Sequence, residues 1–182
     1  MHKIDLNHNR LNLSKFIAIQ IVVILFAILL TYKWAFSFTR VIEQSFLTNI
    51  VFGILGFGIV LGIHEFIHRF SFYVFSKGEK PHFKYKKGIL LIHISKKYFN
   101  KWQFCTIMLA PVIMITATLM VLFSFYSYSS IIFILSIHIA YCLLDLYLVG
   151  IVVINKFKYV QTTDEGLFMY HYQPFQAQND YE

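Results

Sequence analysis

Long, uninterrupted apolar runs constrain the fold of this chain more than any other feature. Four such runs cover approximately residues 16–36, 47–76, 104–125 and 131–154. A helix of about 20 residues spans a hydrocarbon core about 30 Å thick, and each run is long enough to do so. The chain is 58% hydrophobic and only 14% charged, whereas about a quarter of the residues in a typical soluble domain are charged. We therefore predict an all-α membrane protein with about four transmembrane helices.

The connections between the apolar runs leave little room for a second domain. Besides the four runs, the 182 residues comprise a short N-terminal segment, a basic loop at 77–103 and a tail at 155–182. We therefore predict a single membrane domain over residues 1–182. The first run is too long for the core of a signal peptide and lacks a small-residue cleavage pattern, so we expect it to stay attached.

Positive charge is concentrated in the loop after the second run. Nine of the sixteen Lys and Arg lie between Arg69 and Lys101. By the positive-inside rule, this loop and both termini are predicted to face the cytoplasm. Basic residues beside apolar helices favour contact with anionic lipid headgroups, and this placement argues against a nucleic-acid partner.

Two parts of the polar sequence have strand-like composition. Within the basic loop, residues 83–88 end in a Lys-Gly turn signal and lead into residues 89–95. This pattern predicts a short cytoplasmic β-hairpin between helices 2 and 3. In the tail, a turn at 162–166 lies between two short strand-like pieces.

The second apolar run contains the sequence His64-Glu65-Phe66-Ile67-His68. Two histidines four residues apart project from one face of a helix and can bind the same tetrahedral zinc ion. Glu65 is rotated by about 100° around the helix axis, so it can act as general base and acid toward zinc-activated water without being a ligand. Ionisable groups inside an apolar segment usually mark a functional site. The alternative is a purely structural polar cluster.

Asp145 is predicted to be the third zinc ligand, because it is the only carboxylate within the fourth run. It lies about 13 Å along the helix from the predicted cytoplasmic end at Ile154. His64 and His68 lie about 18 and 12 Å from the corresponding end at Ser76. The second and fourth helices are predicted to run in the same direction, so these depths agree. Asp145 can then complete the site and leave one position for water.

His138 lies seven residues before Asp145 and therefore on nearly the same face of the predicted helix. Several roles are consistent with this position. His138 could be an alternative ligand, a hydrogen-bond partner of a ligand, a group that stabilises the oxyanion, or a packing histidine. The residues alone leave these roles open.

Three further features of the apolar runs have simple packing explanations. Cys105 and Cys142 form no disulfide framework, and we interpret them as reduced, structural residues. Gly53, Gly56, Gly58 and Gly62 lie along the second helix, and the spacing of Gly58 and Gly62 permits close helix contact. Packing explains these glycines, which could also leave room for a substrate beside the zinc. Pro111 is predicted to kink the third helix and to free a backbone carbonyl near the core.

The motif at 64–68, together with Asp145, resembles the site-2 protease class of intramembrane metalloproteases. The chain is more closely similar, over about residues 50–170, to small bacterial membrane proteins described as putative zincin peptidases. The similarity includes the basic hairpin segment, the Leu109-Ala110-Pro111 run and the stretch from His138 to Asp145.

The resemblance implies zinc at His64, His68 and Asp145, with Glu65 as base or acid in peptide hydrolysis in a bacterial plasma membrane. One difference concerns the residue after the aspartate. Leu146 follows Asp145 where site-2 proteases usually have glycine, so the fourth helix need not unwind there.

These observations favour a membrane-embedded zinc metallopeptidase that hydrolyses a membrane-associated peptide or protein. A substrate strand could pair with the edge of the hairpin. The alternative is a non-enzymatic metal-binding membrane protein that acts as a structural or regulatory subunit, in which Glu65 would be dispensable. A small transporter is less favoured, because four helices without internal repeats provide little architecture for alternating access.

Overall fold

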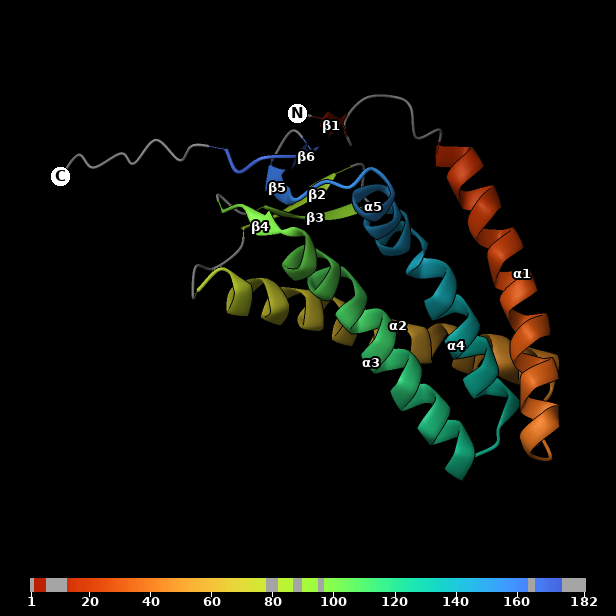
Figure 1. Cartoon of the computed structure of the whole chain (residues 1–182). Coiled ribbons are helices and arrows are strands. Elements are labelled where there is room, and N and C mark those ends of the chain that lie inside the picture. The colour runs from red at the N-terminus through yellow and green to blue at the C-terminus, as the bar shows by residue number, and fades with distance from the viewer. Residues whose placement is uncertain are drawn as a thin grey trace.

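The computed structural model of this chain describes residues 2–5, 13–77, 82–86, 90–94, 97–163 and 166–174. The helices in this part of the chain are α1 (Leu13–Phe38), α2 (Phe46–Phe75), α3 (Lys101–Phe125), α4 (Ser129–Tyr141) and α5 (Leu143–Ile154). The strands are β1 (His2–Asp5), β2 (His82–Lys86), β3 (Leu90–Ile94), β4 (Phe99–Asn100), β5 (Tyr159–Thr163) and β6 (Gly166–Tyr170). The strands gather at one end of the helices (Figure 1).

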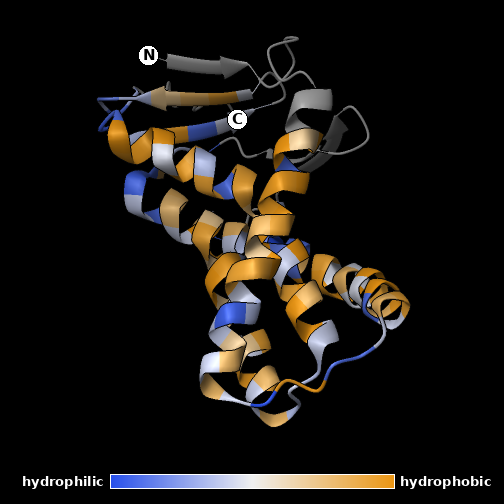
Figure 2. Cartoon of the chain, turned by 90° about the vertical axis from the view of Figure 1, so that its right-hand side faces the viewer, coloured by the Kyte–Doolittle hydropathy of each residue, from blue (hydrophilic) through white to orange (hydrophobic). Residues whose placement is uncertain are grey.

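The helices have the length and the surface of membrane spans. α1, α2 and α3 are each long and apolar enough to cross a membrane, and α4 with α5 forms a fourth candidate. Most of each helix has the colour of hydrophobic residues in Figure 2. Large apolar side chains point outward, such as Leu29 and Phe66 at 69% and 65% exposed. Exposing such a surface to water is unfavourable by about 25 cal/mol per Å². The predicted fold class is confirmed.

The prediction of one continuous helix over residues 131–154 is wrong. α4 ends at Tyr141, α5 begins at Leu143, and the two helix axes are bent by 41°. The bend lies at Cys142, whose backbone ψ of −4° departs from the value of about −42° in a regular helix. Neither proline nor glycine marks this position, so the apolar pattern carried no signal of the break. As a consequence, Asp145 lies in the first turn of α5, where the helix dipole favours a carboxylate.

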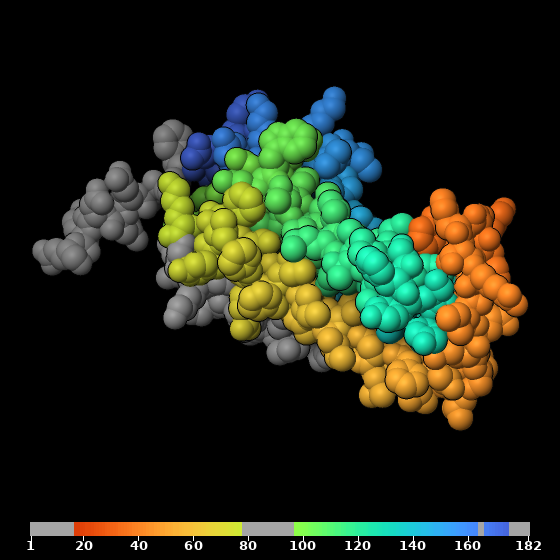
Figure 3. Space-filling model, turned by 90° about the horizontal axis from the view of Figure 1, so that it is seen from below, coloured from red at the N-terminus to blue at the C-terminus, as the bar shows by residue number. Residues whose placement is uncertain are grey.

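α4 occupies the middle of the bundle, where it contacts α1, α2, α3 and α5. α2 extends along the face seen in Figure 3, beside α3 and α4. The close contact between α2 and α4 is made at two glycines. A Cβ atom added at Gly56 would lie 2.4 Å from Cδ1 of Ile134, and one added at Gly53 would lie 3.3 Å from Cβ of Phe133.

The predicted packing role of Gly58 and Gly62 is therefore wrong. Among the described residues, no heavy atom lies within 4 Å of a Cβ added at either position. Both glycines lie on the exposed side of α2. The same helix approaches its neighbour through Gly53 and Gly56, which were not distinguished by spacing alone.

The strands form two antiparallel sheets. β2 pairs with β3, with His82 opposite Ile94, so the predicted hairpin is present between α2 and α3, with bounds that differ by one or two residues. Its Lys87-Gly88 turn lies outside the described residues. The other sheet has the order β1-β6-β5-β4. Its β5–β6 pair comes from the strand-like pieces of the tail, but its assembly with β1 and β4 was not predicted.

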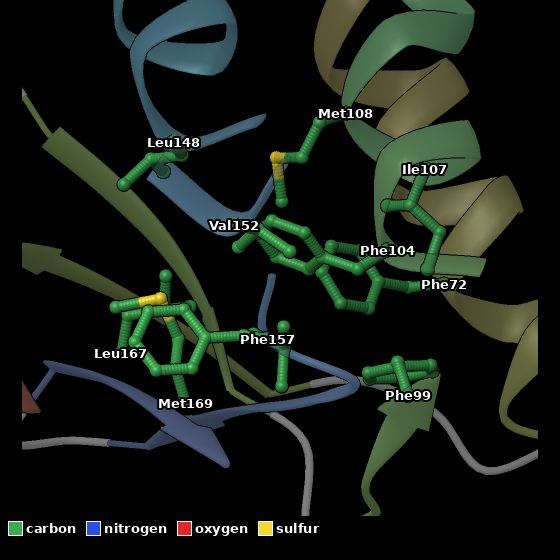
Figure 4. Packing of buried hydrophobic residues seen from close by; sticks show 11 residues of the cluster. Phe72, Phe99, Phe104, Ile107, Met108, Leu148, Val152, Phe157, Leu167 and Met169 are labelled. Carbon is green, nitrogen blue, oxygen red and sulfur yellow. The ribbon is translucent and has the colours of Figure 1, made fainter. Parts of the chain in front are cut away.

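One hydrophobic cluster joins the four-stranded sheet to the ends of α2, α3 and α5 (Figure 4). Its buried members are Phe72, Phe99, Phe104, Ile107, Met108, Leu148, Val152, Phe157, Val160, Leu167 and Met169. Burying a large apolar side chain contributes about 1.5–3 kcal/mol. This core therefore holds three helix ends in fixed positions, and Phe72 lies one helical turn beyond His68.

Candidate metal centre

Two imidazoles and one carboxylate converge between α2 and α5. His64 Nε2 lies 3.3 Å and His68 Nε2 lies 3.5 Å from the same atom, Asp145 Oδ2. His64 and His68 are buried, and the Asp145 side chain is 14% exposed. The structure thus brings together the three residues that the sequence analysis proposed as ligands.

The local sequence explains how α2 presents its two histidines. His64, His68 and Phe72 repeat every four residues and form one buried face, while Phe66 points outward. α5 supplies the opposite wall, because the bend at Cys142 redirects the chain just before Asp145. Leu148, one turn after Asp145, is buried in the cluster that also contains Phe72. The two walls are therefore connected through a common core.

A backbone carbonyl of α3 fixes the orientation of His68. His68 Nδ1 lies 3.1 Å from the Ile107 carbonyl oxygen. This carbonyl is four residues before Pro111, which has no N–H to donate to it within the helix. The predicted freed carbonyl is thus that of Ile107. Since a carbonyl only accepts, a neutral His68 donates from Nδ1 and presents the lone pair of Nε2 to Asp145.

Pro111→Ala is expected to weaken zinc binding through this contact. Alanine supplies a backbone N–H that competes for the Ile107 carbonyl, so His68 is held less firmly in the required orientation. Loss of a hydrogen bond to a metal ligand typically reduces metal affinity about 10–100-fold. We expect a reduction near the lower end, because a carbonyl oxygen has two lone pairs and can accept from the alanine N–H and from His68 together. Competition with a fluorescent zinc chelator measures the change.

The matched control for Pro111→Ala is Ala110→Gly, which perturbs the same turn of α3 without adding an N–H opposite Ile107. Equal zinc affinities in Pro111→Ala and the wild type would contradict the role assigned to this carbonyl.

His138 makes a polar contact with His64. Nε2 of His138 lies 3.3 Å from Nδ1 of His64, and the His138 side chain is fully buried. When His64 carries its proton on Nδ1, it donates to His138 and presents Nε2 to Asp145. Of the roles left open by the sequence, the geometry fits a hydrogen-bond partner of a ligand, because His138 contacts His64 on the side away from Asp145.

Glu65 lies beside the two histidines and is held by Tyr141. The Tyr141 hydroxyl donates to Glu65 Oε1 at 2.8 Å, and its ring lies 5.0 Å from the His64 ring, centroid to centroid. Sequence reasoning missed Tyr141. A signal was available, because Tyr141 precedes Asp145 by four residues and is polar within an apolar run. Cys142, interpreted as structural, also lies beside His64 and His138.

The donor set fits a zinc ion. When both Nδ1 atoms donate their hydrogen bonds, the lone pairs of the two Nε2 atoms face a carboxylate oxygen. A cation between these three atoms removes their repulsion. Ligands at about 2.0–2.2 Å from a tetrahedral zinc are separated by about 3.3–3.6 Å, and the two distances to Asp145 Oδ2 are 3.3 and 3.5 Å. Two imidazoles with one carboxylate favour zinc over magnesium or calcium.

Comparison with known proteins connects this region to one family. The model of a family described as "Putative zincin peptidase" matches residues 57–160, which is more than half of the chain. The matched region contains all the residues of the candidate metal centre. Searches of curated proteins and of solved structures gave no match.

Proposed function

This chain belongs to the family described as putative zincin peptidases, and we propose that it is a membrane-embedded zinc metallopeptidase. The observation that carries the proposal is the convergence of His64, His68 and Asp145 beside Glu65 within apolar helices. Zinc at these three ligands would polarise a peptide carbonyl and lower the pKa of a water ligand toward about 7.

Glu65 supplies the proton transfers of the proposed hydrolysis. It accepts a proton from the attacking water and delivers it to the leaving amine nitrogen as the peptide bond breaks. The hydrogen bond from Tyr141 fixes one carboxylate oxygen, Oε1. This contact limits rotation of the Glu65 side chain, so the carboxylate is preorganised and need not be ordered during the reaction.

The surroundings of the site favour a substrate that is itself associated with the membrane. The proposed ligands lie on helices that are apolar enough to cross a membrane. They lie about one helical turn from the hydrophobic cluster that joins the helices to the four-stranded sheet. A peptide that reaches this depth must enter from the bilayer or from its surface. We propose that the substrate is a membrane-associated peptide or protein cleaved near the cytoplasmic leaflet, with the β2–β3 hairpin as a candidate edge for strand pairing.

Metal removal tests the proposal. The full chain is reconstituted in liposomes with a library of lipid-anchored peptides, and new N-termini are identified by mass spectrometry. We expect cleavage in the zinc-loaded protein, loss after treatment with a chelator, and recovery when zinc is added back. Cleavage that persists in metal-free protein, or its absence from zinc-loaded protein across the library, would contradict the proposed peptidase.

A further inference from the structure

A second group of metal-binding atoms lies on the side of His64 away from Asp145. His64 Nδ1 is 3.3 Å from His138 Nε2 and 3.9 Å from Cys142 Sγ. The distance from Cys142 Sγ to His138 Nε2 is 3.4 Å. All three residues are buried, with exposures of 1% for His64 and 0% for His138 and Cys142.

The chemistry of this group differs from that of the site with Asp145. Two imidazole nitrogens and one sulfur form a softer donor set than two imidazoles and a carboxylate. On a tetrahedral zinc ion, nitrogen and sulfur ligands at about 2.0 and 2.3 Å are separated by about 3.5 Å. The sulfur–nitrogen distances of 3.4 and 3.9 Å bracket this value. The three atoms can therefore close around an ion with little movement.

We propose that His64, His138 and Cys142 form a second site, selective for a thiophilic ion such as Cd²⁺ or Cu⁺, and that its occupancy excludes zinc from the first. The exclusion rests on the proposed zinc site, whereas the second site itself does not. The proposal changes the interpretation of Cys142 from a packing residue to a metal ligand.

His64 makes the two sites exclusive because a neutral imidazole has only one nitrogen lone pair. The first site uses the lone pair of Nε2, with a proton on Nδ1 that is donated to His138. The second site uses the lone pair of Nδ1, with a proton on Nε2 that is donated to Asp145 Oδ2, 3.3 Å away. Binding at the second site releases one proton, from the Cys142 thiol, and shifts the His64 proton between ring nitrogens.

Cadmium provides a direct test, because a cadmium–thiolate bond gives an ultraviolet charge-transfer band. The full chain, purified in detergent and stripped of metal, is titrated with Cd²⁺. We expect the band to saturate at one equivalent in the wild type. It should be lost in Cys142→Ser and kept in Cys105→Ser, which alters the other free cysteine.

Two further variants keep the proposal testable and separate it from the peptidase. Asp145→Asn should retain the cadmium band, because Asp145 belongs only to the first site. His138→Gln should weaken cadmium binding at least tenfold while circular dichroism shows an unchanged helix content. A band that survives in Cys142→Ser, or that is absent from the wild type, would overturn the second site whatever the fate of the proposed peptidase.

Exclusivity is tested on zinc-loaded protein. As the cadmium band appears in the wild type, a chelating dye should report the release of zinc in equal amount. Retention of a full equivalent of zinc alongside a saturated cadmium band would show that both ions bind together, and would overturn the exclusion.

Discussion

Glu65→Gln is expected to lower the rate of peptide hydrolysis by about 10²–10⁴-fold, the usual contribution of a positioned general base. Glutamine has nearly the same shape and can still accept the hydrogen bond from Tyr141, but it cannot take a proton from water. Because Glu65 is not among the three proposed ligands, zinc content should stay at that of the wild type. Cleavage assays and metal analysis of the same preparations measure both quantities.

Tyr141→Phe is expected to lower the rate of hydrolysis less than Glu65→Gln does. It removes the hydrogen bond to Glu65 Oε1 but keeps the carboxylate, so its rate should lie between those of the wild type and Glu65→Gln. Unchanged cleavage in Glu65→Gln with zinc still bound would rule out this mechanism. That result would favour the alternative in which the protein binds metal as a structural or regulatory subunit.

The sequence was informative about the site because both ligand elements are regular helices. Spacing of four residues placed His64 and His68 on one face, and counting from the helix ends gave Asp145 a similar depth. Depth counted along a helix does not depend on knowing the neighbouring helices, only on the direction in which each one runs. The structure brings the same three side chains within reach of one ion.

The contacts around the ligands could not be predicted in the same way, since they depend on rotations of helices about their axes. Pro111 predicted a freed carbonyl in α3, but not that His68 would use it. The break between α4 and α5 at Cys142 could not be predicted, because neither proline nor glycine occurs there. This break determines how Tyr141 and Cys142 approach α2.

Helix packing showed a similar limit. Any of the four glycines of α2 would permit close approach of a neighbouring helix, because glycine has no side chain. Only Gly53 and Gly56 face α4. The four-stranded sheet required β1, β4, β5 and β6 to come together from distant parts of the chain, and short strands carry too little local pattern to specify such pairing.

Loss of one ligand should have the largest effect on metal content. Asp145→Ala leaves two imidazoles and removes the only negative ligand of the proposed zinc site, and His64→Ala leaves one imidazole and the carboxylate. Removing a hydrogen-bond partner of a metal ligand typically lowers metal affinity about 10–100-fold. Removing a ligand itself is expected to lower metal affinity further. His171→Ala, which removes an exposed histidine outside the site, is the control.

Zinc content per chain, measured by mass spectrometry on detergent-purified protein after dialysis, tests the central claim most directly. We expect about one zinc per chain in the wild type, in His171→Ala and in Glu65→Gln, and close to none in His64→Ala, His68→Ala and Asp145→Ala. A full equivalent of zinc in Asp145→Ala that persists when Cys142→Ser is combined with it would show that the carboxylate of α5 does not bind the ion, and would contradict the account.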